Sequence, residues 1–248
     1  MNIVIIGATS GIGKALFEKY ANEKNRIGII GRRAHLVDEL YHKYPSKTIP
    51  AKADISNLEE IGQAICTLHE TLGHIDLAIA CAGTGEINAT LDYAVERPTI
   101  DTNVVGWTFV IDMLYHIFER QGCGYLVAIT SAGGLRGEPM APAYSATKAY
   151  QINYMEALRK KAFKNGGHII VTDIRPGLVD TAMAKGEGLF WVMPVEKVVY
   201  YNQIDIGIFL CFLELCLNKN NIEFDRTLYV EENVDNEKNL TAIYKINS

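Results

Sequence analysis

Short runs of apolar and often β-branched residues alternate with longer amphipathic stretches along most of the 248-residue chain. The short runs predict strands, and the longer stretches, in which apolar residues recur every three or four positions, predict helices. Strands are expected at residues 2–6, 26–30, 47–51, 75–80, 125–130 and 169–174, with residues 226–230 as a candidate last edge strand. Helices are expected to begin near Gly11, Ala34, Asn57, Tyr93, Ala143 and Pro194.

This alternation is typical of βαβ units, which stack their strands into a parallel sheet covered by helices. The sequence therefore predicts an α/β fold, a Rossmann-like doubly wound parallel sheet of six to seven strands with helices on both faces, in three α/β/α layers. A length of 248 residues is near the upper limit for one hydrophobic core, so a single domain over residues 1–248 is expected. Residues 182–193 lack a clean period and contain the bulky Phe190 and Trp191, which predicts a lid over a binding site.

Composition and charge exclude several classes of protein. With 48% apolar and 21% charged residues the composition is that of a soluble globular protein, and a net charge of −5 with scattered lysines and arginines argues against binding to nucleic acid. The apolar run at 204–217 contains two acidic residues and is shorter than the ~20 residues that span a bilayer, so no membrane span is expected. No targeting signal is visible, and five cysteines without metal-ligand spacing suit a reducing cytoplasm, with no metal site.

Three glycines lie at the turn between the first predicted strand and the first helix, in the segment 7–13 (GATSGIG). Glycines there let the backbone approach a pyrophosphate, whose charge is stabilised by the free N–H groups and the dipole of the following helix. A tight strand-to-helix turn without a ligand is the simpler interpretation and stays open. Because a doubly wound sheet binds its dinucleotide at the first βα unit, the candidate residues are Gly7, Thr9, Ser10, Gly11, Ile12 and Gly13.

Tyr144 and Lys148 are four positions apart on a predicted helix, so their side chains lie on one face and can meet. A phenol is a poor proton donor or base near neutral pH, and a cation held beside it stabilises the phenolate. The pair alone is also compatible with an ordinary surface pair. Ser131 follows the fifth strand, where its hydroxyl can stabilise charge on a substrate oxygen. Asn103 lies within a predicted helix, where a local backbone hydrogen bond is the simpler role.

The spacing Gly-x-x-x-Gly-x-Gly and the Tyr-x-x-x-Lys pair, with Asn103 and Ser131 in the same order, resemble the short-chain dehydrogenase/reductase family over about residues 1–198. The resemblance implies that Tyr144 is the general acid/base, that Lys148 assists it and holds the nicotinamide ribose, and that Ser131 orients the substrate oxygen. It also implies that Asn103 kinks its helix and holds a water of the proton relay. Asn103, Tyr144 and Lys148 are thereby also expected to contact the cofactor.

Residues after the other strands extend the expected cofactor site. Arg32 and Arg33 stand at the end of the second strand, where an NAD-binding protein carries an acid, and arginines there suit a 2′-phosphate, so NADP(H) is favoured over NAD(H). Arg32 is nearer the strand end, and Arg33 can also be a solvated surface residue. Asp54 and Ile55 match the family position whose acid contacts adenine, although Asp54 can equally cap a helix. Further cofactor contacts implied by the resemblance are Ala82, Gly83, Pro176, Gly177, Val179 and Thr181.

Together these features predict an NADP(H)-dependent oxidoreductase that interconverts a carbonyl and an alcohol on a small or partly hydrophobic substrate. Residues 133–136, the loop 84–92 and the lid are expected to line the substrate pocket. The resemblance implies a homodimer or homotetramer, while the tail 199–248 is atypical of the family. Two other interpretations stay open: a catalytically silent nicotinamide-binding sensor or scaffold, and a sugar-nucleotide epimerase or dehydratase of related fold.

Overall fold

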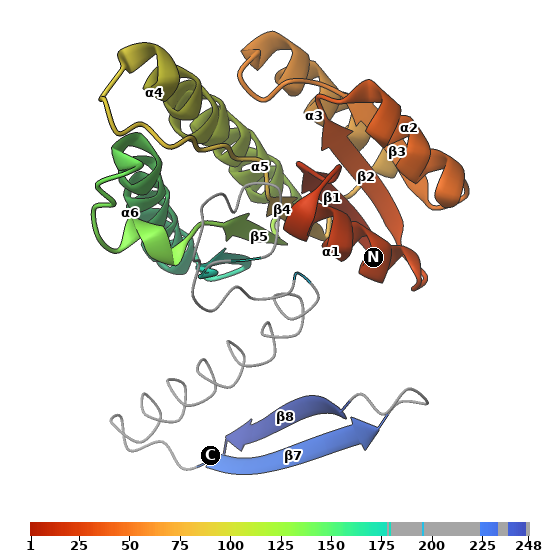
Figure 1. Ribbon diagram of the computed structural model, residues 1–248. Coiled ribbons are helices and arrows are strands. Elements are labelled where there is room, and N and C mark those ends of the chain that lie inside the picture. The colour runs from red at the N-terminus through yellow and green to blue at the C-terminus, as the bar shows by residue number, and fades with distance from the viewer. Residues whose placement is uncertain (178, 180–194, 196–223, 233–237, 247–248) are drawn as a thin grey trace. The chain divides into compact units, whose positions relative to one another are not determined.

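A computed structural model describes residues 1–177, 179, 195, 224–232 and 238–246 of the chain (Figure 1). The chain divides into two compact units, Met1–Val195 and Glu196–Ser248. The lid predicted at 182–193 and the helix predicted near Pro194 lie outside the described residues. Thr181 lies outside them as well, and every other candidate site residue belongs to the described part of the first unit.

Six parallel strands form one sheet in the first unit (Figure 1). They are β1 (Asn2–Ile6), β2 (Arg26–Gly31), β3 (Thr48–Lys52), β4 (Leu77–Ala80), β5 (Gly124–Ile129) and β6 (Ile169–Ile174). Their order is β3-β2-β1-β4-β5-β6, so the direction in which the sheet grows reverses between β1 and β4. Sheets of this kind bind ligands outside the carboxyl ends of their strands, at this reversal. The predicted doubly wound α/β fold is confirmed, with six strands in the parallel sheet.

The helices occupy the connections between these strands (Figure 1). They are α1 (Gly11–Ala21), α2 (Ala34–Lys43), α3 (Leu58–Leu72), α4 (Tyr93–Ile100), α5 (Trp107–Gln121) and α6 (Pro142–Lys164). A π-helical segment, η1 (Asp101–Gly106), joins α4 to α5, and a short 3-10 helix, η2 (Ala132–Gly134), follows β5. The helix predicted from Tyr93 onward therefore exists but is widened in its middle.

Local sequence explains where these helices begin and which face they bury. In α3 the side chains of Ile61, Ile65, Leu68 and Leu72 recur every three or four residues, and all four are buried. Asn57 caps this helix because its side chain accepts a hydrogen bond from the N–H of Glu60. In α6 a proline occupies the first turn, where its missing N–H would have had no helical partner.

Two apolar layers sandwich the sheet. One hydrophobic cluster joins the inner faces of α3, α5 and α6 to alternate residues of β1, Val4 and Ile6. Ile3 and Ile5 are also fully buried but lie outside this cluster, because successive side chains of a strand point to opposite faces. The helices α1 and α2 contact the sheet at β1, β2 and β3. Burial on both faces of β1 confirms the three-layer arrangement.

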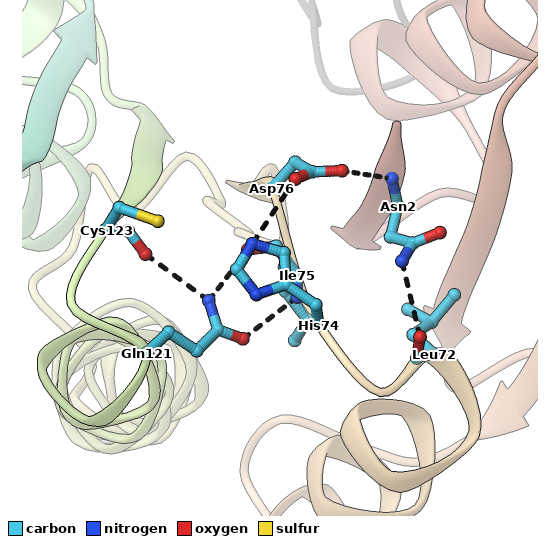
Figure 2. A network of polar contacts seen from close by, with 7 residues as sticks. All are labelled: Asn2, Leu72, His74, Ile75, Asp76, Gln121 and Cys123. Atoms are coloured by element: carbon cyan, nitrogen blue, oxygen red, sulfur yellow. Dashed lines mark hydrogen bonds and ion pairs between the residues drawn. The ribbon is translucent and has the colours of Figure 1, made fainter.

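A polar network ties together the amino ends of β1, β4 and β5 (Figure 2). The carboxylate of Asp76 accepts a hydrogen bond of 2.6 Å from the backbone N–H of Asn2. The side chain of Gln121 accepts from the N–H of Ile75 and donates to its carbonyl, both at 2.9 Å, and also donates to the carbonyl of Cys123. These bonds fix the connection into β4 at the amino ends of the strands. The candidate site lies on the opposite side, at the carboxyl ends of the strands.

The strand predicted at 226–230 has a different partner from the one expected. It lies within β7 (Phe224–Glu232), which pairs antiparallel with β8 (Lys238–Ile246) in a separate two-stranded sheet. The prediction that it closes the edge of the parallel sheet is therefore wrong. Only five residues separate the two strands in sequence, and a short connection favours antiparallel pairing of neighbours.

Candidate active site

The candidate residues lie together on the side of the parallel sheet where the strands have their carboxyl ends. Each of the six strands has its carboxyl end on this side, and the segments that follow the strands carry residues 7–13, 32–33, 54–55, 82–83, 131, 176–177 and 179. Asn103 reaches the same region from η1, and Tyr144 and Lys148 reach it from α6. Parallel strands bring their carboxyl ends to one side, so residues far apart in sequence meet there.

The glycine-rich turn after β1 packs tightly against its neighbours. Gly7 has a φ of +87°, and a Cβ at this position would lie 2.6 Å from the N atom of Ala82 in the segment after β4. A Cβ on Gly13 would lie 2.2 Å from the carbonyl oxygen of Gly7. The tight-turn interpretation therefore accounts for these two glycines. The first turn of α1 carries no acidic residue, so its free N–H groups and positive dipole end also suit an anion.

A cavity of about 400 Å³ lies beside this turn, lined by Arg32, Arg33, Lys52, Ala53, Asp54 and Glu60. The guanidinium of Arg33 donates hydrogen bonds to the hydroxyls of Thr9, at 3.0 Å, and Ser10, at 2.7 Å. Arg33 is exposed, and these two bonds link its guanidinium to the glycine-rich turn. The side chain of Arg32 is 65% exposed, and its Nη1 lies 3.9 Å from a carboxylate oxygen of Asp54.

Lys52 is a cationic residue of this cavity that the sequence analysis missed. It is paired in register with Gly31, directly before Arg32, and its ammonium lies 2.9 Å from the carboxylate of Asp38. The available signal was the parallel alignment of β2 and β3, because residues at the carboxyl ends of adjacent strands share one edge.

Asp54 does not cap the helix that follows, since Asn57 has that role. Its carboxylate accepts hydrogen bonds from the backbone N–H and the hydroxyl of Ser56. Burial opposes ionisation of Asp54, but the bonds from Ser56 and the charge of Arg32 outweigh it and lower the pKa. Asp54 is therefore an acceptor at the edge of the cavity, next to the buried Ile55.

Asn103 is fully buried in η1, and its hydrogen bonds reach distant segments. Its side-chain oxygen accepts from the N–H of Thr84 at 2.9 Å, and its amide nitrogen donates to the carbonyl of Thr84 at 2.7 Å. The same nitrogen donates to the hydroxyl of Thr147 at 3.1 Å. These partners are 19 and 44 positions away, so the local backbone bond considered from the sequence is not what Asn103 makes.

Lys148 is 5% exposed, and its ammonium donates to the carbonyl of Ile129 at 3.2 Å and to the side-chain oxygen of Gln151 at 2.9 Å. Burial lowers the pKa of Lys148 to about 8, and the nearby Cys81 opposes this. The ammonium lies 5.8 Å from the centre of the Tyr144 ring. The Tyr-x-x-x-Lys motif is therefore not a surface pair, because its cation is enclosed.

The side chains of Ser131 and Tyr144 both lie next to Gly133. A Cβ placed on Gly133 would lie 3.3 Å from the Ser131 oxygen and 3.6 Å from Cε1 of Tyr144. On the opposite side, a Cβ on Gly85 would lie 2.4 Å from Cδ2 of the same ring. The tyrosine ring is therefore held between the segment after β5 and the loop 84–92.

The side chains of Lys148 and Asn103 both lie next to Gly83. A Cβ on Gly83 would lie 3.5 Å from the Lys148 nitrogen and 3.3 Å from the Asn103 side-chain oxygen. Ala82 and Gly83 thus connect the glycine-rich turn with the buried lysine. After β6, the carbonyl of Pro176 accepts a hydrogen bond of 2.8 Å from the N–H of Ala132, which joins that segment to the Ser131 side of the site.

Three further residues support the site and were missed from the sequence: Thr84, Thr147 and Gln151. Lys148 follows Tyr144 by four positions, and Gln151 follows Lys148 by three. Both spacings keep residues on one face of a helix, so all three lie on the same face of α6. A polar residue on an otherwise buried helical face was the signal that could have identified Gln151.

The described part of the chain has neither a metal-binding cluster nor a membrane-spanning helix. It contains no group of three or more histidine, cysteine or acidic side chains arranged to hold a metal ion. None of its helices is both long and apolar enough to cross a bilayer. A second cavity, of about 380 Å³, lies between α5 and α6 and contains none of the candidate residues.

Comparison with known proteins places these motifs in a family. The model of the short chain dehydrogenase family matches residues 1–189. An uncharacterized oxidoreductase of Staphylococcus epidermidis is 30% identical over 188 residues, which cover 74% of this chain and 80% of the relative.

Solved structures share the fold at lower identity. A short chain dehydrogenase/reductase from Burkholderia phymatum in complex with NAD superposes with a TM-score of 0.74 at 18% identity, covering 83% of this chain and 85% of the other. ElxO with NADP bound gives a TM-score of 0.72 at 21% identity, covering 81% and 89%. The matched region includes every candidate site residue, and the chain therefore belongs to the short-chain dehydrogenase family of oxidoreductases.

Proposed function

We propose that the protein is an NADP(H)-dependent oxidoreductase that interconverts a carbonyl and an alcohol, with Tyr144 as the general acid and base. The observation that carries the proposal is the enclosed ammonium of Lys148 beside the Tyr144 ring, with the Ser131 hydroxyl and the same ring both bordering Gly133. A buried cation without a paired carboxylate is costly, and such an arrangement is typical of a site that performs proton transfer.

The residues at the carboxyl ends of the strands fit a dinucleotide. Only glycine fits at positions 7 and 13, and the backbone there can approach a pyrophosphate at the amino end of α1. Gly83 and the buried Lys148 would hold the ribose next to the nicotinamide, while Asp54 would accept from adenine. The segment of Pro176, Gly177, Val179 and Thr181 is assigned to the carboxamide. When bound, the nicotinamide supplies or accepts the hydride.

The side chains of this chain perform the proton transfer. In the reducing direction the Tyr144 hydroxyl donates its proton to the substrate oxygen, and in the oxidising direction it takes that proton back. The Lys148 ammonium stabilises the phenolate that is left behind. The Ser131 hydroxyl donates a hydrogen bond to the substrate oxygen, where charge develops.

The walls around Tyr144 favour a small or partly hydrophobic substrate. Large apolar side chains are exposed in the two segments that border the ring: Ile87 and Leu91 in one, Leu135 and Met140 in the other. The N–H of Asn88 donates to the carbonyl of Met140, so the two segments meet. Exposed apolar side chains next to convergent polar groups are characteristic of small-molecule pockets.

The preference for NADP(H) rests on charge at the end of β2. Structural neighbours contain either NADP, as ElxO does, or NAD, as the Burkholderia phymatum protein does, so the fold accommodates both. Arg32, Arg33 and Lys52 line one cavity in this chain, and a 2′-phosphate would complement these three cations. No acid occupies the position of Arg32, where an NAD-binding protein would bind the ribose hydroxyls.

Titration of the protein with NADPH and with NADH, followed by nicotinamide fluorescence, tests this preference. We expect NADPH to bind more tightly, and Arg33→Ala or Arg32→Ala to weaken NADPH by roughly 10- to 100-fold, because a hydrogen bond to a charged group contributes about 1.5–3 kcal/mol. NADH binding should change little. Arg26→Ala is the matched control, since Arg26 lies at the opposite end of the same strand. Equal loss of NADPH and NADH affinity would contradict the assignment.

The proposal extends to the setting of the enzyme. A cytoplasmic location is supported by the free and exposed thiols of Cys66 and Cys123, which suit a reducing compartment. A homodimer or homotetramer is proposed because closed symmetric assemblies are the usual form of soluble oligomers. The single cofactor-binding domain is proposed to include a lid at 182–193 and an atypical tail at 199–248.

A further inference from the structure

Gln151 is a fully buried polar residue on the face of α6 that carries Tyr144 and Lys148. Its side-chain oxygen accepts a hydrogen bond of 2.9 Å from the Lys148 ammonium. Its amide nitrogen donates a hydrogen bond of 2.8 Å to the backbone carbonyl of Asn103. A single side chain therefore bridges the catalytic lysine on α6 and the π-helical segment η1.

The chemistry of the two partners fixes the orientation of this amide. An ammonium group is only a donor, and a backbone carbonyl is only an acceptor. Rotating the amide of Gln151 by half a turn would place its NH2 against the ammonium and its oxygen against the carbonyl, and both bonds would be lost. One orientation satisfies both partners, so the bridge joins Lys148 to Asn103 with a defined orientation of the amide.

The other groups that face Lys148 offer little compensation for its charge. Cys81 approaches from the end of β4, and burial raises the pKa of its thiol to about 12, so the thiol is neutral. Tyr144 faces the ammonium from the same helix, and Ile129 contributes a backbone carbonyl from the end of β5. Among the described residues no carboxylate forms an ion pair with Lys148. The two oxygens that accept from the ammonium belong to Ile129 and Gln151.

We propose that Gln151 is a positioning residue for Lys148: its amide holds the ammonium toward Tyr144 and favours the protonated lysine, using the Asn103 carbonyl as its anchor. The proposal rests on the proposed function, because it concerns the lysine that assists Tyr144. Two of the three N–H bonds of Lys148 are engaged by Ile129 and Gln151. The remaining one is left for the tyrosine and the ligand, and its direction is set by the other two.

The Gln151 amide lies between two residues of the expected proton relay, Asn103 and Lys148. The carbonyl of Asn103 is joined to the lysine through the Gln151 amide, with hydrogen bonds of 2.8 Å and 2.9 Å. An amide keeps its protons near neutral pH, so this link orients Lys148 and does not itself conduct protons. The role of Gln151 is therefore in geometry and in the protonation state of Lys148.

The test is an NMR titration of the lysine side-chain nitrogens in the full-length, cofactor-free protein, with the Lys148 signal assigned by its absence in Lys148→Met. In Gln151→Leu we expect the apparent pKa of Lys148 to fall by about one unit, since an acceptor for the charged form is removed. In Gln151→Glu, which keeps the size and the acceptor, we expect the apparent pKa to rise above that of the wild type. Gln63→Leu, on the exposed face of α3, is the control and should have no effect.

A second readout uses the pH profile of kcat/KM. Activity should decline with rising pH when Lys148 loses its proton, so this decline should move to lower pH in Gln151→Leu and to higher pH in Gln151→Glu. A residue that only supports the fold would reduce stability without moving either titration. If the Lys148 titration is unchanged in Gln151→Glu and in Gln151→Leu, or in the one variant that folds, the proposal is overturned. Shifts of Lys148 in a protein that turns over no carbonyl would instead defeat the proposed function.

Discussion

Lys148 holds a positive charge in a setting that provides neutral oxygens, a neutral thiol and an aromatic ring. Burial lowers its pKa to about 8 from an ordinary value of 10.5. Between these two values the unfolded chain binds a proton that the native state has lost, so the free energy of unfolding increases as the pH rises through this window. Below about pH 8 both states are protonated, and the cost of the buried charge is present in full.

This cost predicts how the stability of Lys148→Met compares with that of the wild type. Each pKa unit corresponds to about 1.4 kcal/mol, so between pH 7 and pH 10.5 the wild type should gain about 3 kcal/mol relative to the variant. Urea unfolding of both proteins across this pH range measures the difference. Lys160→Met provides the control, because Lys160 is exposed on the same helix and pairs with Glu156 at the surface. A constant difference between wild type and Lys148→Met would contradict the buried-cation account.

At the residue scale the sequence predicted which side chains approach one another better than it predicted their surroundings. The spacing of Tyr144 and Lys148 indicated a shared helical face, but it did not indicate that Lys148 is buried or that its neighbours include Cys81 and Gln151, which lie outside the motif. The sequence also ranked Arg32 above Arg33 from its distance to the strand end. In the structure Arg33 bonds to Thr9 and Ser10, a contact that depends on how the turn after β1 folds.

At the scale of elements, η1 is the feature that builds the site. The π-helical segment between α4 and α5 contains Asn103 and ends at Gly106. The periodicity of apolar residues predicted a helix from Tyr93 onward but not the widened turn, because a single inserted residue hardly changes a 3.6-residue period. The turn is fixed by its contacts with other elements, including those of Asn103 with Thr84 and Thr147.

Gly106 gives a direct test of this element. A Cβ at this position would lie 2.1 Å from the carbonyl oxygen of Ile55, a backbone atom that cannot move without shifting the segment after β3. Gly106→Ala should therefore lower the free energy of unfolding by about 2–3 kcal/mol. It should also weaken cofactor binding, since η1 and Ile55 both adjoin the site.

Chemical denaturation compares this variant with Gly137→Ala. A Cβ on Gly137 would meet nothing within 4 Å, so that variant should stay within about 0.5 kcal/mol of the wild type. Equal stability of both variants would show that η1 tolerates a side chain at Gly106.

At the scale of the whole molecule, the order of strands and helices along the chain sufficed to predict the parallel sheet. Each predicted strand from β1 to β6 lies next to a helical stretch, and connections of that length join parallel strands. The pairing of β7 with β8 was not predicted, because a single strand-like run does not reveal its partner. The meeting of Arg33, Lys52 and Asp54 at one cavity likewise required the register of β2 and β3.

The central claim is that Tyr144 transfers the proton in a reduction that uses NADPH. The most direct test follows NADPH oxidation with a panel of aldehydes and ketones, for the wild type and Tyr144→Phe, together with the NADPH affinity of each. We predict turnover of at least one carbonyl by the wild type and a loss of roughly 10²- to 10⁴-fold in kcat/KM for the variant, with NADPH affinity nearly unchanged. Undiminished turnover by Tyr144→Phe, or tight NADPH binding by the wild type without reduction of any carbonyl, would contradict the account.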